Sequence, residues 1–228
     1  MTKFQKVIRK INEIKGQVGW QWRKRDARRW FLRTKFGIEQ QRELVVLGDP
    51  VRYGTVRLAL DQVDVNLIPG ALAECGVYKG VLSKFIHERL PNRTFYLFDT
   101  FAGFDERDSD SKGDLRFRDT SAEQVLNHIG ETCNVIVRQG YFPETAHGLE
   151  AERFAFVMLD FDKYEPTLAA LEFFYPRMSA GGFIFIHDYS SPESDWACSR
   201  AVDTFLADKP EKPLLIPDAW GTAVFRKT

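Results

Sequence analysis

The chain has 228 residues, with 32 basic and 32 acidic side chains, which suits one large domain or a domain with an appendage. Its three cysteines, Cys75, Cys133 and Cys198, form no CxxC pair, so the pattern disfavours a zinc ribbon and a secreted disulfide framework. No apolar run approaches the roughly 18 residues of a membrane-spanning helix, and no apolar signal segment begins the chain, so we expect a cytoplasmic protein.

The N-terminal segment is a basic arm. Residues 1–42 carry thirteen lysines and arginines against three acids, which leaves 19 basic and 29 acidic groups for the rest of the chain. Apolar residues recur at helical spacing from Phe4 to Val18, and Trp20, Trp22 and Trp30 follow them. We therefore expect a helical arm at residues 1–43 and a second domain at residues 44–228. Such an arm can pack on its own domain. It can also pack on a second subunit, and the protein would then be a homo-oligomer, most simply a dimer. Peripheral membrane contact stays open, and binding to nucleic acid is not favoured.

From residue 71 onward, short apolar strands alternate with helices. The polar segment 102–120 is expected to be a loop, and Gly181 and Gly182 a turn. This alternation predicts an α/β doubly wound, mostly parallel sheet that binds its ligand at the carboxyl ends of the strands. The sequence predicts strands at 71–75, 94–99, 134–138, 154–160, 183–187, 214–216 and 222–226, and helices at 80–90, 121–130, 166–175 and 195–207.

The first strand runs into a glycine turn, residues 74–80 (ECGVYKG). The turn lets a ligand approach the backbone closely, but it lacks the second glycine of the dinucleotide fingerprint. Glu74 would repel a phosphate and suits a ligand with a cationic end. Asp99, at the end of the next strand, can accept hydrogen bonds from both hydroxyls of a ribose. A nucleoside with a positive charge indicates S-adenosylmethionine.

Acids also follow the two apolar strands that end near residues 160 and 187. If these strands are neighbours, Asp160, His187 and Asp188 converge beside the glycine turn and could hold a divalent cation or act as a general base. Asp162 is instead expected to cap the helix that starts at Pro166. Among the other histidines, His87 is expected at the protein surface.

Six segments resemble a known family in order and spacing. From about residue 52 onward the chain resembles the macrocin O-methyltransferase (TylF-type) family of class I S-adenosylmethionine-dependent methyltransferases. The resemblance implies a Rossmann-like, seven-stranded sheet whose last strand is antiparallel. It also implies methyl transfer to a hydroxyl of a sugar, a glycosylated natural product or a polysaccharide. The matching segments are 74–80, 99–104 (DTFAGF), 140–145 (GYFPET), 159–167 (LDFDKYEPT), 175–189 (YPRMSAGGFIFIHDY) and 201–205 (AVDTF).

The same resemblance implies roles for individual residues. Asp160, His187 and Asp188 would form the catalytic and metal-binding group, with magnesium held by acids and the carboxylate of Asp160 as the base. The cofactor-binding residues would be Thr55, Glu74, Gly76, Tyr78, Gly80, Asp99, Thr100, Gly140, Tyr141 and Asp160.

The chain departs from the family pattern at His187, where the family usually has an acid. Magnesium prefers oxygen ligands, so the imidazole weakens the expectation of a magnesium site. Three outcomes stay open: magnesium with two carboxylates and water, a metal that tolerates nitrogen such as manganese, iron or zinc, or no metal with His187 as the base.

The 102–120 loop, with Arg107, Lys112, Arg116 and Arg118, is the expected lid and reader of the acceptor. Two alternative functions stay open. One is a nucleic-acid- or membrane-binding protein that uses the basic arm and has a degenerate methyltransferase body. The other is an NAD(P)-dependent oxidoreductase, against which Glu74 and the missing glycine argue.

Overall fold

The structure is a computed structural model that describes residues 43–108 and 113–228. The expectations for the basic arm, including its helix and its contacts, lie outside the described residues, and the division of the chain at residue 43 stays a prediction. No helix of the described segments has the length and apolar composition that crossing a bilayer requires.

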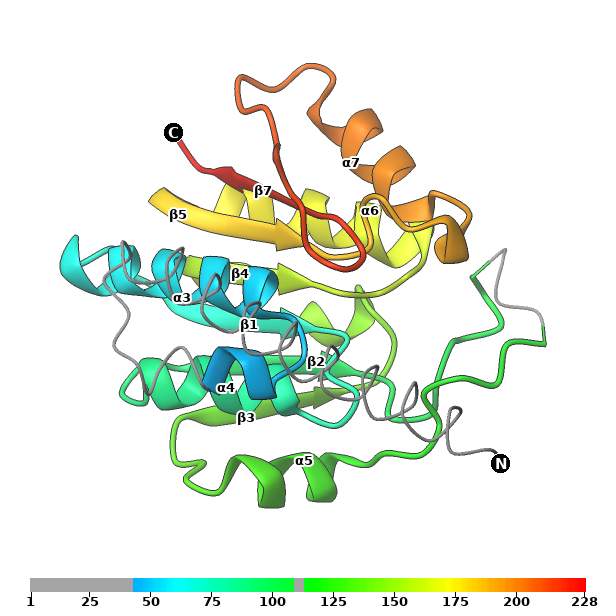
Figure 1. Cartoon of the computed structure of the whole chain (residues 1–228), viewed down its shortest axis with the longest axis horizontal. Helices are drawn as coiled ribbons and strands as arrows, with labels where there is room; N and C mark the ends of the chain where they lie inside the picture. The colour runs from blue at the N-terminus through cyan, green and yellow to red at the C-terminus, as the bar shows by residue number, and fades with distance from the viewer. Residues whose placement is uncertain (1–42, 109–112) are drawn as a thin grey trace, which may run out of the picture. The chain divides into compact units, whose positions relative to one another are not determined.

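A seven-stranded sheet forms the centre of the fold (Figure 1), in the order β3-β2-β1-β4-β5-β7-β6. Strands β1 to β5 are parallel to one another, whereas β7 is antiparallel to both β5 and β6. The predicted doubly wound, mostly parallel sheet is therefore confirmed, and so is the antiparallel last strand. The strands are β1 (Ala71–Cys75), β2 (Phe95–Asp99), β3 (Val135–Gln139), β4 (Phe154–Leu159), β5 (Met178–Ile186), β6 (Leu214–Ile216) and β7 (Thr222–Arg226).

Helices cover the sheet because its strands are apolar on both faces. One face packs against α6 and α7 through a buried cluster that includes Phe98, Phe174, Ile186 and Val202. The helices are α3 (Pro50–Val65), α4 (Val81–Arg89), α5 (Ala122–Ile129), α6 (Tyr164–Phe174) and α7 (Ala197–Leu206), with short 3-10 turns at Glu144–Ala146, Tyr175–Arg177 and Pro192–Ser194.

The period of two along β1 decides which residues face which helices. Ala73 and Cys75 belong to the cluster under α6 and α7. Glu74 therefore points to the opposite face, where its carboxyl lies near Ser83 of α4. This placement separates Glu74 from the cavity described below.

Three local expectations were wrong. The two glycines that we expected to form a turn before the fifth strand lie inside β5. A Cβ on Gly182 would come 2.8 Å from the carbonyl oxygen of Ala155 in the neighbouring strand, so the close approach of the two strands explains a glycine at this position. His87 is buried in α4, with only 3% of its surface exposed. Helix α6 begins at Tyr164, two residues before Pro166. The sequence analysis also missed α3, whose helical pattern is weakened by Gly54 and by several valines.

Candidate active site

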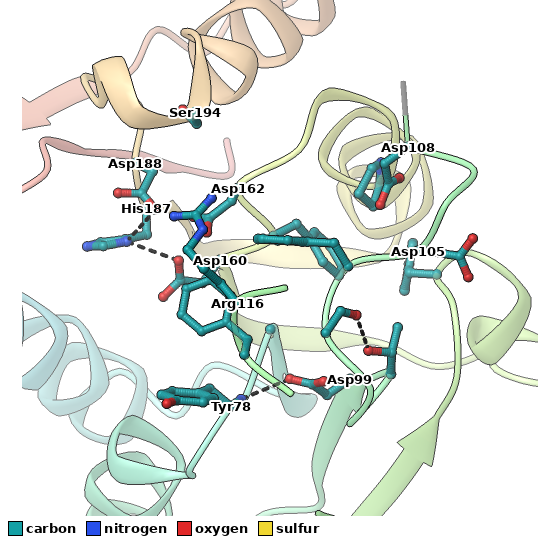
Figure 2. Close-up of a pocket in the computed structure, with 18 of the residues that line it drawn as sticks. Tyr78, Asp99, Asp105, Asp108, Arg116, Asp160, Asp162, His187, Asp188 and Ser194 are labelled. Atoms are coloured by element: carbon teal, nitrogen blue, oxygen red, sulfur yellow. Dashed lines mark hydrogen bonds and ion pairs between the residues drawn. The ribbon is translucent and has the colours of Figure 1, made fainter. Parts of the chain in front are cut away.

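The carboxyl ends of β1, β2, β4 and β5 border a cavity of about 330 Å³ (Figure 2). The residue that follows each strand is held by a neighbouring strand. The N–H of Gly76 donates to the carbonyl of Phe98 at 2.9 Å, that of Asp160 to Cys75 at 2.8 Å, and that of His187 to Leu159 at 2.8 Å. The sheet itself thus fixes the positions of the residues that line the cavity.

Gly76 begins the turn after β1 and lies against the next strand end. Its φ is +81°, and a Cβ at this position would come 1.9 Å from the carbonyl oxygen of Asp160. Only a residue without a side chain fits between the two backbones. The glycine expected from the sequence therefore has a packing reason, and its role in ligand binding stays a prediction.

Asp99 organises the turn that follows β1. One oxygen, Oδ2, accepts the N–H groups of Val77 at 2.7 Å and Tyr78 at 2.8 Å, and Oδ1 accepts the N–H of Phe101 at 2.7 Å. A carboxylate offers about four acceptor positions, so one of them, on Oδ1, is left for a ligand hydroxyl. The sequence predicts two ribose contacts for Asp99, whereas this carboxylate already has three backbone partners and keeps one free position. Its contact with a ribose stays a prediction.

The cavity gathers most of the predicted cofactor-binding residues. Thr55, Glu74 and Gly80 do not line it. Thr55 lies in α3, where its hydroxyl donates to the carbonyl of Val51 at 2.7 Å. Gly80 precedes α4 and lies against Val125. A cofactor role for these three stays a prediction. The predicted residues that line the cavity are Gly76, Tyr78, Asp99, Thr100, Gly140, Tyr141 and Asp160.

Glu74 is fully buried behind the glycine turn. Burial raises the pKa of its carboxyl to about 8, and the nearby Ser83 opposes this only in part. At neutral pH the side chain therefore holds a proton. This differs from the anionic group that the sequence analysis expected beside a cationic ligand.

The raised pKa of Glu74 makes the stability of the fold depend on pH. Between the unfolded pKa, about 4.3, and the folded value, the folded state keeps a proton that the unfolded state releases. The free energy of unfolding therefore falls as pH rises through this window, by up to about 1.4 kcal/mol per pH unit. We expect Glu74→Gln to remove this slope, so that thermal melting shows a growing advantage of the variant between pH 5 and 8. Glu172→Gln, at an exposed position of α6, should follow the wild-type curve; parallel melting curves for all three proteins would contradict the assignment.

Asp160, His187 and Asp188 converge at the ends of β4 and β5, as the sequence predicts (Figure 2). Nδ1 of His187 lies 3.0 Å from Oδ1 of Asp160 and 3.2 Å from Oδ2 of Asp188. Burial alone would lower the pKa of His187, but the charge of Asp160 and the hydrogen bonds to both carboxylates outweigh burial and raise it to about 10. The imidazole is therefore protonated at neutral pH.

Two further residues belong to this group, and the sequence analysis missed both roles. Asp162 was expected to cap α6, but the residue before the helix is Lys163, and Asp162 lines the cavity. Burial and a hydrogen bond to Asp188 raise the pKa of Asp162 to about 9. Arg52, in the first turn of α3, places Nη1 3.7 Å from Oδ2 of Asp160.

The backbone at the strand ends is unusual. Tyr78, Phe101, Asp162 and Asp188 all adopt positive φ, between 50° and 60°. For a residue other than glycine this conformation costs about 1–3 kcal/mol, and such residues gather at functional sites. All four lie in the turns after β1, β2, β4 and β5, which aim side chains at the cavity.

The described part of the 102–120 loop is attached to the glycine turn. The hydroxyl of Thr120 donates to the carbonyl of Tyr78, and the hydroxyl of Tyr78 donates to Asp119 at 2.8 Å. Arg116 lines the cavity and is held by both oxygens of Asp114. Of the other expected loop cations, Arg107 lies over the ring of Tyr141 at 3.9 Å, and Lys112 lies outside the described residues. Reading of an acceptor by this loop stays a prediction.

The cavity thus has two halves of different chemistry. At the ends of β1, β2 and β3 it offers glycine turns and the acceptor oxygen of Asp99, which suit a nucleoside. At the ends of β4 and β5 it offers carboxylates and an imidazole, which can remove a proton from a second substrate. Such an arrangement can transfer a group from the first ligand to the second.

Comparisons with known proteins agree with this description. The profile of the macrocin O-methyltransferase (TylF) family matches residues 45–227. The chain is 31% identical over 173 residues to the 8-demethyl-8-(2,3-dimethoxy-alpha-L-rhamnosyl)-tetracenomycin-C 4'-O-methyltransferase of Streptomyces olivaceus, a match that covers 68% of this chain and 64% of that protein. It is 30% identical over 158 residues to the mycinamicin III 3''-O-methyltransferase of Micromonospora griseorubida, covering 60% of this chain and 61% of that protein. Each match thus spans less than two thirds of the relative's length.

Among solved structures, the O-methyltransferase NovP has a similar fold. It superposes with a TM-score of 0.66 at 23% sequence identity, covering 78% of this chain and 80% of NovP. At this identity the likeness concerns the fold alone.

Proposed function

The chain belongs to the macrocin O-methyltransferase (TylF) family, and from this premise we propose that it is an S-adenosylmethionine-dependent O-methyltransferase that acts on a sugar hydroxyl. The observation that carries the proposal is the cavity that joins the turn of Gly76 and Asp99 to the carboxylates of Asp160 and Asp188. The sugar acceptor is supported by the two relatives, whose names describe methylation of a rhamnosylated tetracenomycin and of mycinamicin III.

The residues of the cavity fit this cofactor. The cavity has a volume of about 330 Å³, which lies within the range of roughly 300–1,000 Å³ that is typical of small-molecule sites. Asp99 keeps an acceptor position for a ribose hydroxyl, and Gly76 lines the cavity beside it. S-adenosylmethionine, when bound, supplies a methyl group activated by a cationic sulfur.

The chain's own task is to position the acceptor and to take its proton. With the cofactor bound, the acceptor oxygen would take its methyl group, and the sulfur would leave with the electron pair of the carbon–sulfur bond. The hydroxyl proton passes to a carboxylate, for which we assign Asp160. His187 and Asp188 hold Asp160 in place, and His187 is a positioning residue because its Nδ1 already faces both carboxylates. Alignment and exclusion of water supply the rest of the acceleration.

Binding of S-adenosylhomocysteine, the demethylated product, tests the cofactor half without an acceptor. We expect saturable calorimetric binding to the wild type, and binding to Asp99→Asn weaker by about 10- to 100-fold, because a hydrogen bond to a charged group contributes about 1.5–3 kcal/mol. Asp203→Asn, whose carboxylate accepts the hydroxyl of Tyr189, is the matched control and should bind normally. Equal affinity of all three proteins would contradict the role of Asp99.

An acceptor screen then tests the activity. It should include methyl α-L-rhamnopyranoside, nucleotide-linked deoxysugars and glycosylated polyketides, with release of S-adenosylhomocysteine as the signal. The oxidoreductase alternative predicts instead a change in NADH fluorescence on mixing. The proposed homo-oligomer, the peripheral membrane contact and the cytoplasmic location rest on the basic arm or on the sequence, and each stays a prediction.

A further inference from the structure

The chemistry of the donor atoms at Asp160, His187 and Asp188 does not fit the magnesium that the family resemblance implies. Magnesium demands near-octahedral coordination by hard oxygen ligands. Here one of the three ligands is an imidazole, and its Nδ1 lies at hydrogen-bonding distance from an oxygen of each of the two carboxylates. A metal would have to displace the proton that these two oxygens share with the ring.

The two carboxylates of the cluster already have partners in the chain. Asp160 has Nδ1 of His187 at one oxygen and the guanidinium of Arg52 at the other, 3.7 Å away. Asp188 also faces Nδ1 of His187, at 3.2 Å. A magnesium ion would have to displace these contacts and would lie beside the permanent positive charge of Arg52.

The position of His187 also limits what it can do. In Figure 2 its ring lies beside Asp160 and Asp188 and extends away from Asp99 and Tyr78. Its Nε2 is buried and has no hydrogen-bond partner among the residues that the structure describes. The ring therefore faces the carboxylates, and the proton of an acceptor is left to them.

We infer that the site does not hold magnesium, because Nδ1 of His187 takes the place of an oxygen ligand and Arg52 already supplies a positive charge next to Asp160. This inference rests on the proposed methyl transfer for its meaning, but its main test is metal binding, which needs no turnover. It removes the first of the outcomes left open by the sequence and keeps Asp160 as the base.

The test is calorimetric titration of full-length protein, stripped with EDTA and saturated with S-adenosylhomocysteine, with magnesium, manganese and zinc chlorides. We expect no saturable binding of magnesium to the wild type, and no magnesium at stoichiometric level in the protein as purified. Binding of manganese or zinc without binding of magnesium would support the inference, as would no binding of any of the three. Saturable magnesium binding to the wild type, or a loss of activity in EDTA that magnesium restores, would overturn it.

The reciprocal experiment builds a carboxylate site. His187→Asp replaces an imidazole by a carboxylate within about 4 Å of two other carboxylates, and the Coulomb attraction of the added charge for a divalent ion predicts magnesium binding at least about 100-fold tighter than in the wild type. We also expect magnesium to raise the melting temperature of this variant alone. His128→Asp, at an exposed position of α5, is the matched control and should bind no magnesium.

The outcomes separate this inference from the proposed function. If no acceptor is methylated with or without metal, the proposed function fails, while the calorimetric result on the wild type still decides the question of the metal. If His187→Asp does not fold, the metal content of the wild type and its response to EDTA decide it alone. Magnesium binding to the wild type as tight as to His187→Asp would refute the role of the imidazole.

Discussion

Asp160→Asn is expected to lower kcat for methyl transfer by about 10²- to 10⁴-fold, which is the usual contribution of a general base. The substitution keeps the size of the side chain but removes the group that takes the acceptor proton. The N–H of residue 160 would still donate to the carbonyl of Cys75 at the end of β1, so the strand end should keep its place. Binding of S-adenosylhomocysteine is therefore expected to stay within the range of the wild type.

Two measurements separate chemistry from folding in this experiment. Calorimetry with S-adenosylhomocysteine reports the cofactor half, and initial rates with the acceptor found by the screen report the chemical step. Asp203→Asn, which changes a carboxylate on α7 that bonds Tyr189, should keep normal rates. A variant Asp160→Asn with more than about a tenth of the wild-type kcat would remove Asp160 from the role of base.

Among substitutions that add one methyl group in the described part of the chain, Gly76→Ala is expected to lower the stability of the fold most. The added Cβ would lie 1.9 Å from the carbonyl oxygen of Asp160, and neither backbone can move without breaking the bond between Asp160 and Cys75. Overpacking costs about 1–3 kcal/mol and positive φ adds a similar amount. At about 2–4 °C per kcal/mol for a domain of this size, melting should fall by about 5–20 °C.

Gly148→Ala isolates the conformational part of that cost. Gly148 has a similar φ, +85°, but nothing lies within 4 Å of the Cβ that would be added. We expect this variant to lose only the few degrees that positive φ costs and to bind S-adenosylhomocysteine normally. Suppose that Gly76→Ala had the same melting temperature as Gly148→Ala and the wild-type affinity for S-adenosylhomocysteine. The close approach of the two strand ends would then contribute nothing to stability or binding.

The sheet could be predicted from the sequence because each buried strand is a short apolar run that ends at a polar or glycine residue. Asp99, Asp160 and Asp188 were found in this way, since the carboxyl ends of parallel strands meet at one edge. Fully buried runs do not alternate, however, so the sequence did not reveal which face Glu74 occupies. The expected contact of Glu74 with a cationic ligand depended on that unknown.

The residues that sequence reasoning missed come from neighbouring elements. Arg52 reaches Asp160 from α3, a helix whose glycine and valines hide its pattern. Asp162 looked like a cap because Pro166 marks a helix start, but the helix begins before the proline and Asp162 turns into the cavity at positive φ. His87 looked like a surface residue because its helix carries charges on both sides of it. Proximity in space, which single-sequence patterns do not contain, decides all three.

Tyr78 gives the two halves of the cavity a shared component. Its N–H is held by Asp99, its carbonyl accepts the hydroxyl of Thr120, and its ring meets that of Phe117 edge to face. A ligand that favours one conformation of this turn also favours one conformation of the loop that carries Phe117 and Arg116. Linkage is reciprocal for binding, so the factor by which a bound donor changes the affinity for the acceptor equals the factor by which a bound acceptor changes the affinity for the donor.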